Sequence, residues 1–233
     1  MNNLDLYCVT NKKLEFLEYT DLKLAAVGKE KFSNRYLRCD NKINIYYKEQ
    51  YYSELTFHYW YWKNCLINEK KDWIGFCQKR RFWIKPEKNK SIININNLND
   101  FLIDKIDYSL ENYESIICEP IKVSGAKKVK IIKRGWRNLI KDPSIIFKTK
   151  KETISFHFDM HHGYKNLEKA AKLLDNNDRD DFLSYINTNS FYNPHIMCIA
   201  RPEILDKWFT ALFFWLERCE VQFGFKELKG YDT

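Results

Sequence analysis

Residues 51–83 form an unusually aromatic stretch that joins two different hydrophobic patterns. In its first half apolar residues recur every three or four positions, which predicts a helix with one apolar stripe and with Ser53 as its cap. The predicted stripe consists of Tyr52, Leu55, Tyr59 and Trp62. In the second half, residues 73–77 are continuously apolar without a helical period, which predicts a buried strand. The stretch therefore requires a fold that packs a helix and a fully buried strand.

Three cations and an amide follow the predicted strand directly, as Gln78, Lys79, Arg80 and Arg81. Open α/β sheets bind ligands at the carboxyl ends of their strands, and planar guanidinium groups suit bidentate contact with phosphate. We therefore expect a diphosphate-binding clamp here, with Glu54 on the preceding helix. The alternative is that these charges only accompany a strand as it leaves the core.

The composition is that of a folded protein: 233 residues, 45% hydrophobic and 30% charged. This length allows one large domain with a substantial core. The net charge of +8 favours a partner that carries phosphate or a surface of anionic lipid. Seven dispersed cysteines without a CxxC pair indicate reduced thiols. With no signal peptide and no apolar run of about 20 residues, we expect a cytoplasmic protein.

The amino-terminal residues predict the start of a nucleotide-binding α/β unit. An apolar strand over residues 4–10 ends in Thr10, Asn11 and Lys12, and a second short strand over 24–28 closes on Gly28. No GxGxxG or GxxxxGK[ST] motif accompanies them. Further apolar patterns predict a strand near 115–118, helices near 98–106, 167–174 and 178–186, and a long helix from Pro202.

Residues 126–151 are strongly basic, with ten lysines and arginines against the single acidic residue Asp142. One interpretation is a solvated loop or hairpin, because charge runs usually face water. The other is a surface that meets phosphates or an anionic membrane, with Trp136 and Phe147 as anchors.

A second cluster of chemically active residues lies at His157, Asp159, His161 and His162. Such a group can ligate a metal or perform acid–base chemistry. In an extended strand the first three would share one face, and His162 would point away. The spacing is not a known zinc pattern, so the chemistry stays open.

Two runs within the aromatic stretch, SELTFHYWYWKN and DWIGFCQKRRFW, together carry a resemblance to a known family. They resemble the pattern ELTxxYWxWKN…D[WY]IG[FL]xHYRR[YF] of a bacterial domain family of capsular and O-antigen polysaccharide biosynthesis, which includes galactofuranosyltransferases. Residues 27–28, 40–45, 157–162 and 193–199 resemble the family's VG, DxxxNI, QYxxxH and PxNMFI elements. Departures are Gln78, Lys79 and His157, where the family has histidine, tyrosine and glutamine, and Ile196, where it has asparagine.

The resemblance implies a GT-A-like single domain with a mixed, largely parallel central sheet flanked by helices. Residues 1–83 would bind a nucleotide-sugar donor, expected to be UDP-linked. Residues 84–151 would be a variable basic insertion, and residues 152–233 would receive the acceptor. The expected function is transfer of a hexosyl or galactofuranosyl group to a hydroxyl of a growing polysaccharide. The enzyme would be cytoplasmic, at the inner face of the membrane through residues 126–151.

The expected donor-binding residues lie at strand ends and in the matched segments. They are Thr10, Asn11, Lys12, Gly28, Asp40, Asn44, Tyr52, Gln78, Arg80 and Arg81. Those expected on the acceptor side are His157, His161, Asn193 and His195.

Asp159 is the expected general base, because it lies among histidines in the half that should meet the acceptor; His162 and Glu54 are the next candidates. The alternative for Asp159 is a carboxylate that only orients a histidine. Most GT-A folds hold a metal with a DxD motif, but the chain's DxD, at residues 178–180, falls in a polar helical setting. Fixed cations are therefore expected to do some or all of the metal's work, and a metal held elsewhere, with Asp159 and His161 as possible ligands, stays open.

A second class of function is a non-catalytic binding protein, whose basic surface holds nucleic acid or another anionic polymer. Such a surface would interleave aromatic and basic residues. Here the aromatic residues are concentrated in residues 51–83, which have the pattern of a core. The enzyme is therefore the favoured hypothesis, and nucleic acid is a disfavoured partner.

Overall fold

The computed structural model describes residues 4–68, 70–86, 92–123, 136–141, 143–146 and 152–225. The chain divides into two compact units. The first comprises Met1–Cys118 and His195–Thr210, and the second comprises Glu119–Pro194 and Ala211–Thr233. The sequence analysis divides the chain at residues 83 and 151 into a donor-binding part, a basic insertion and an acceptor-side part. This functional division stays a prediction.

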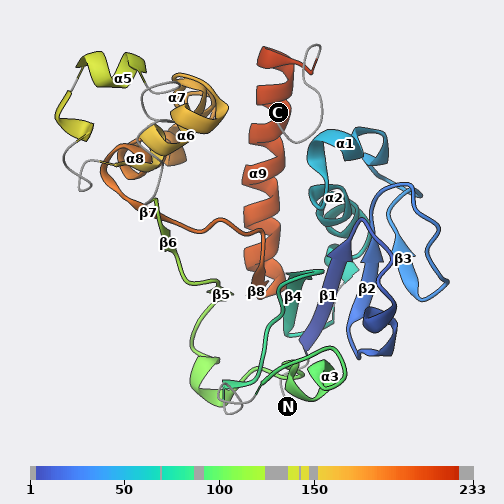
Figure 1. Cartoon of the computed structure of the whole chain (residues 1–233). Helices are drawn as coiled ribbons and strands as arrows, with labels where there is room; N and C mark the ends of the chain where they lie inside the picture. The colour runs from blue at the N-terminus through green and yellow to red at the C-terminus, as the bar shows by residue number, and fades with distance from the viewer. Residues whose placement is uncertain are drawn as a thin grey trace. The chain divides into compact units, whose positions relative to one another are not determined.

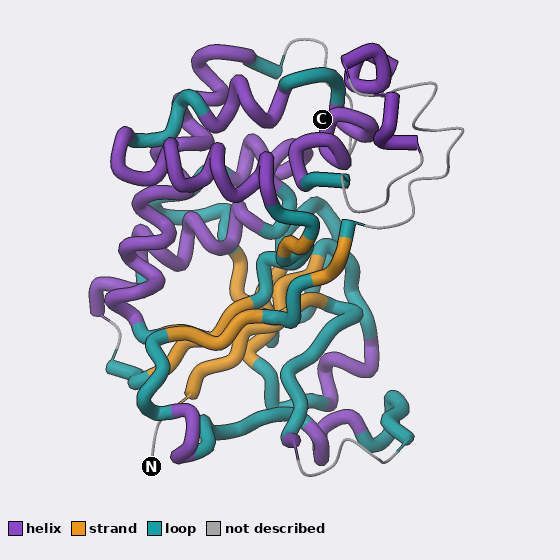
Figure 2. The backbone as a smooth tube through the Cα atoms, turned by 90° about the vertical axis from the view of Figure 1, so that its left-hand side faces the viewer, coloured by secondary structure: helices purple, strands orange, loops and turns teal. Residues whose placement is uncertain are grey.

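The first unit is built on a six-stranded sheet in the order β3-β2-β1-β4-β8-β5 (Figure 1). The strands are β1 Leu4–Thr10, β2 Lys23–Ala26, β3 Tyr36–Arg38, β4 Trp73–Gln78, β5 Ser115–Ile117 and β8 Cys198–Ala200. The first four are parallel, whereas β8 runs antiparallel to both β4 and β5. Figure 2 shows these strands side by side in orange. The expected mixed, largely parallel sheet flanked by helices is confirmed.

Short helices and helical turns connect the strands of the first unit. They are α1 Glu49–Tyr52, α2 Leu55–Asn64, α3 Leu98–Phe101, η1 Glu15–Tyr19, η2 Tyr46–Lys48, η3 Leu66–Asn68 and η5 Tyr108–Leu110. The helix expected near residues 98–106 is therefore a single turn, and after Phe101 the backbone becomes extended at Leu102.

The helix α2 buries a different face from the expected one. Phe57 and Tyr61 are fully buried and pack on Tyr7 of β1 and Phe76 of β4. The predicted stripe of Tyr52, Leu55, Tyr59 and Trp62 is only half-buried. The prediction was wrong because aromatic residues lie on every face of this helix, so their spacing does not single out one side. Ser53 makes no cap bond with its side chain, because a break at its φ of +45° separates α1 from α2.

The second unit is mainly helical in its described part. It contains α5 Trp136–Lys141, η6 Pro143–Ile146, α6 Ile154–His162, α7 Asn166–Ala171, α8 Asn176–Thr188 and the strand pair β6 Ile121–Lys122 and β7 Phe191–Tyr192. Its buried centre comprises Val123, Ile154, Ala171 and Ile186. The long helix α9, Pro202–Phe223, begins in the first unit and ends in the second. Among the described residues, no helix is long and apolar enough to cross a membrane.

Most of the basic segment 126–151, including Phe147, lies outside the described residues. The exposed ring of Trp136, at the start of α5, belongs to the part that is described. The expected membrane surface therefore stays a prediction.

Candidate functional site

The carboxyl ends of four parallel strands lie at one edge of the sheet in the first unit. The chain runs outward from β1 through β2 to β3, and then places β4 on the other side of β1. This reversal is a topological switch point, where open α/β sheets bind their ligands. The expected donor residues Thr10 and Gln78 end the two strands that flank it.

The loop after β1 is held in one conformation by a pair of local hydrogen bonds. Thr10 Oγ1 donates to the Lys12 carbonyl at 2.7 Å and accepts from the Lys12 N–H at 3.0 Å. The Thr10 carbonyl accepts from Val27 N at 2.9 Å, which ties this loop to the end of β2. Asn11 is thereby presented at the switch point, while the Lys12 side chain is exposed.

Side chains at the end of β4 and just before α2 lie at this edge of the sheet. The Lys79 ammonium donates to Asn11 Oδ1, so a cation lies between the ends of β4 and β1. Gln78 Nε2 donates to Glu54 Oε2 at 2.6 Å, which brings the expected catalytic Glu54 to the same edge. A backbone bridge between Gln78 and Arg81 turns the chain back at this point.

Burial raises the pKa of Glu54, while the Gln78 hydrogen bond and the Lys79 and Arg81 cations lower it less. The Glu54 carboxyl therefore holds its proton more firmly than an exposed glutamate, as acid–base residues in sites often do. Arg80 and Arg81 are exposed at this edge. Lys79 is one of the cations of the expected diphosphate-binding clamp, although it was not singled out as a donor-binding residue, and its contact with Asn11 was not predicted.

Gly28, just beyond β2, has the left-handed backbone conformation, with φ of +81°. A Cβ at this position would lie 3.5 Å from Glu49 Oε1 and 3.6 Å from Asn11 Cβ. Glycine is therefore favoured here by conformation, and it leaves the edge open beside Asn11.

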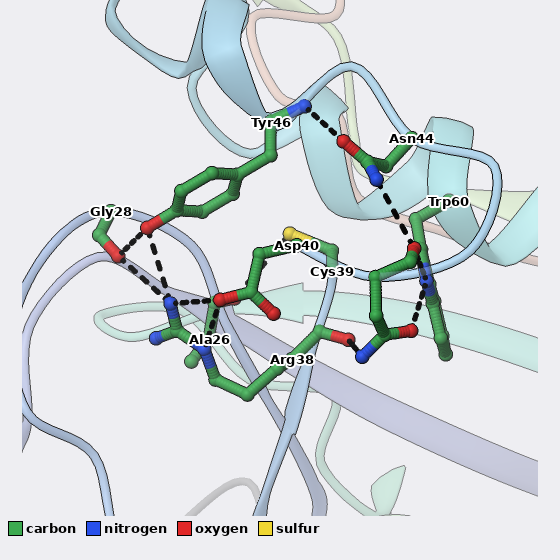
Figure 3. Close-up of polar contacts among 9 residues, drawn as sticks. Ala26, Gly28, Arg38, Cys39, Asp40, Asn44, Tyr46 and Trp60 are labelled. Atoms are coloured by element: carbon green, nitrogen blue, oxygen red, sulfur yellow. Dashed lines mark hydrogen bonds and ion pairs between the residues drawn. The ribbon is translucent and has the colours of Figure 1, made fainter.

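Arg38, at the end of β3, organises the neighbouring part of the edge (Figure 3). Its Nη2 donates to Asp40 Oδ2 at 2.9 Å and to the Tyr46 hydroxyl at 3.1 Å. The Gly28 carbonyl accepts from both Arg38 and Tyr46. Within the described chain Asp40 Oδ1 makes no hydrogen bond. Asp40, which is expected to bind the nucleotide-sugar, therefore keeps one carboxylate oxygen that can accept a hydrogen bond from a ligand. Sequence reasoning missed Arg38 and Tyr46.

Asn44 has a local partner for each polar atom of its side chain (Figure 3). Its amide donates to the Asn41 and Lys42 carbonyls at 3.2 and 2.9 Å, and its Oδ1 accepts from Tyr46 N at 3.1 Å. Trp60 of α2 donates to the carbonyl of Asn41 at 3.0 Å. Asn44 therefore shapes the loop that carries Asp40, a role that does not itself require a ligand.

The histidine cluster lies on helix α6 of the second unit, so the shared face considered for an extended strand does not form. The Thr153 hydroxyl accepts from Phe156 N at 3.2 Å and caps the helix. His157 and His161, four residues apart, have ring centroids 4.5 Å apart. Burial and the neighbouring histidines lower the pKa of His157.

Asp159 does not share the face of these histidines, because residues two apart on a helix point to different sides. It is buried, at 5% exposed, and its Oδ1 accepts from Lys165 N at 2.9 Å. Lys165, which donates this bond, has a left-handed backbone conformation with φ of +59°. Asp159 therefore supports the turn after α6, whereas His162 is exposed at the helix end. No three or more histidine, cysteine or acidic side chains in the described ranges are grouped to hold a metal.

Comparison with known proteins bears on this geometry. Residues 5–233 match the family described as "Domain of unknown function (DUF4422)". The chain belongs to this family. The apo structure of the WbbM bifunctional glycosyltransferase is similar to the chain, with 19% identity and a TM-score of 0.63. The match covers 94% of this chain and 37% of the WbbM chain, and it shows a shared fold. No curated protein matches the sequence.

The remaining expected residues of this DUF4422 domain are only partly buried. Tyr52 ends α1, with the Lys48 ammonium 5.8 Å from its ring centroid. Asn193 belongs to the second unit and His195 to the first. Their shared role on the acceptor side stays a prediction.

His58 is a fully buried histidine of the DUF4422 domain that the sequence did not single out. Its Nδ1 donates to the Glu54 carbonyl at 2.8 Å, and its ring lies 4.4 Å from that of Phe76. Among the described residues its Nε2 has no partner. Burial lowers the pKa of His58 to about 4.

We expect this buried imidazole to destabilise the domain in acid. Between pH 6.5 and 4 the unfolded chain binds a proton at His58 that the folded protein excludes, so stability falls as pH falls. The loss by pH 4 is on the order of 3 kcal/mol from this group. Denaturant unfolding of His58→Asn across this range should show a shallower decline than the parent. The matched variant of the exposed His162, His162→Asn, should follow the parent; equal declines in all three proteins would contradict the assignment.

Proposed function

We propose that this DUF4422 domain is a glycosyltransferase that uses a nucleotide-sugar, most simply a UDP-sugar. The sugar passes to a hydroxyl of a growing capsular or O-antigen-type polysaccharide, with hexosyl or galactofuranosyl transfer as the expected chemistry. The shared fold with a glycosyltransferase and the sequence resemblance support this proposal. The donor would occupy the carboxyl edge of β1–β4 in the first unit.

The observation that carries the proposal is the polar arrangement at the switch point. Lys79 and Asn11 join the two strand ends, and Glu54 and Gln78 lie beside them. A held ammonium group is suited to stabilise a diphosphate leaving group as negative charge develops. The exposed Arg80 and Arg81 supply further cations for the same diphosphate. Asp40, which is held by Arg38 near the end of β3, is the proposed contact of the nucleoside.

The proposed general base is Asp159, which would activate the acceptor hydroxyl, and His162 and Glu54 are the next candidates. His157, His161, Asn193 and His195 are the proposed acceptor-side residues. Asp159 and His161 do not fit a shared metal, because α6 turns their side chains apart. Asp178 and Asp180, the DxD of the chain, are exposed on α8. The roles proposed for these residues therefore do not depend on a metal held by either pair.

The proposed partners beyond donor and acceptor are lipid surfaces. The basic residues 126–151 would bring a cytoplasmic enzyme to the anionic inner face of a membrane and to a lipid-linked acceptor. This segment lies largely outside the described residues.

A thermal-shift comparison of UDP with oligonucleotides tests the proposal. A ligand that binds only the native state stabilises it by about 2.7 kcal/mol at 100 times its Kd. We expect UDP to raise the melting temperature and a mixed-sequence oligonucleotide to leave it unchanged. The reverse result would favour the alternative, a non-catalytic basic protein that binds nucleic acid or another anionic polymer.

A further inference from the structure

A pocket of about 430 Å³ and a larger one of about 540 Å³ lie in the first unit, and neither includes the donor residues. The larger one, called here the η1–α3 pocket, lies between the turn η1 and the start of α3. Its lining includes Glu15, Phe16, Tyr19, Ile95, Asn96 and Asn99. Its volume is in the range of about 300–1,000 Å³ that small-ligand sites occupy.

The η1–α3 pocket is separate from the carboxyl edge of the sheet. Asp21, just before the amino end of β2, donates its backbone N–H to Asn99 Oδ1 at 2.7 Å. Figure 1 shows α3 beside the amino end of β1, whereas the strands point away from it. A molecule in this pocket would therefore not be the donor nucleotide.

The polar wall of the η1–α3 pocket is held in place by its own asparagines. Asn99 Nδ2 donates to Asp21 Oδ2 at 2.8 Å. Asn94 Oδ1 accepts from Asn96 N at 2.9 Å, and Asn97 Oδ1 accepts from Asn94 N at 2.8 Å. The asparagine-rich segment thus forms ordered turns, and an ordered wall loses less entropy when a ligand binds.

The lining of the pocket combines aromatic rings and planar polar groups with the aliphatic Ile95 and the hydroxyl-bearing Thr20. Tyr19, 75% exposed, and the half-buried Phe16 supply aromatic rings. Glu15 offers carboxylate acceptors, and the exposed Asn96 offers an amide with two donors and an acceptor. Its described lining contains no lysine or arginine and one carboxylate, so phosphate and other anions are disfavoured.

A neutral ligand with an apolar ring face and a polar rim fits this lining. A sugar ring carries C–H groups on its faces and hydroxyl groups around its edge, which are matched by aromatic rings and planar amide or carboxylate groups. We propose that the η1–α3 pocket binds a neutral oligosaccharide chain, remote from the donor edge. This inference does not rest on the proposed transferase activity.

Saturation-transfer NMR with neutral tri- to hexasaccharides of galactose, glucose and mannose tests the proposal. We expect at least one of these oligosaccharides to bind the parent protein. Tyr19→Ala and Asn96→Ala should each weaken that binding by about tenfold or more. The matched variant Tyr47→Ala removes a tyrosine that is 76% exposed elsewhere in the unit, and it should bind as the parent does.

Two results would overturn the inference: no neutral oligosaccharide binds the parent, or binding persists unchanged in Tyr19→Ala and Asn96→Ala. Preference for a sulfated oligosaccharide of the same length would contradict the charge argument. The thermal shift with UDP, measured on Tyr19→Ala, separates this question from the proposed function. If Tyr19→Ala keeps the thermal shift with UDP but loses oligosaccharide binding, the η1–α3 pocket is a second site. If UDP fails to bind even the parent protein, only the proposed transferase function is contradicted.

Discussion

Asp159→Asn is expected to lower turnover by about 100-fold or more while leaving the affinity for UDP nearly unchanged. The asparagine keeps the shape of the side chain but cannot accept a proton from the acceptor hydroxyl. It also keeps an oxygen that can accept from Lys165 N, so the turn after α6 should be preserved. Turnover of a UDP-sugar, measured together with UDP affinity and thermal stability, checks this prediction.

Asp159→Ala gives a useful comparison, because it removes both the base and the bond to Lys165. If Asp159 has only the structural role, Asp159→Asn should be active and Asp159→Ala should be unstable. Turnover of Asp159→Asn within a few-fold of the parent would move the base to His162 or Glu54. Parallel tests of His162→Asn and Glu54→Gln would then decide between them.

Lys79→Met is expected to weaken UDP binding by about tenfold or more, which corresponds to about 1.4 kcal/mol. Methionine keeps much of the length of the side chain but removes the ammonium that lies between β4 and β1. The loss should also raise the pKa of Glu54 further, since the Lys79 cation lowers it in the parent. Isothermal titration with UDP measures the effect directly.

The exposed Arg80 and Arg81 provide an internal comparison for Lys79. Because solvent screens exposed charges, Arg80→Ala and Arg81→Ala should each weaken UDP binding less than Lys79→Met does. Lys172→Met, which alters an exposed lysine of the second unit, should bind UDP as the parent does. Normal binding by all three variants at residues 79–81 would remove the diphosphate site from the end of β4.

The buried strands were predicted from the sequence because their apolar runs are continuous. Residues 4–10 and 73–77 are predicted and observed as the neighbouring strands β1 and β4. The closing glycine at the end of β2 was predicted as well, and Gly28 has the positive φ that favours glycine. The polar residues that directly follow these buried strands therefore correctly predicted one edge of the sheet.

Helical faces were predicted less well than strands. In α2 the half-buried Tyr59 and the fully buried Tyr61 have the same residue type, so only packing against Tyr7 and Phe76 distinguishes them. The sequence of residues 157–162 is compatible both with the alternation of a strand and with the spacing of a helix. The hydroxyl cap at Thr153 decides for the helix, and that choice turns Asp159 away from His157.

The sequence by itself determined the strand cores, the polar strand ends and the membership in DUF4422, because these depend on residue types that are contiguous in the chain. Only the tertiary structure decided which distant residues meet. Lys79 and Asn11 are 68 positions apart, and Asp21 and Asn99 are 78 apart. Such pairs depend on the order of strands in the sheet and on the turns between them, which local hydrophobic patterns do not specify.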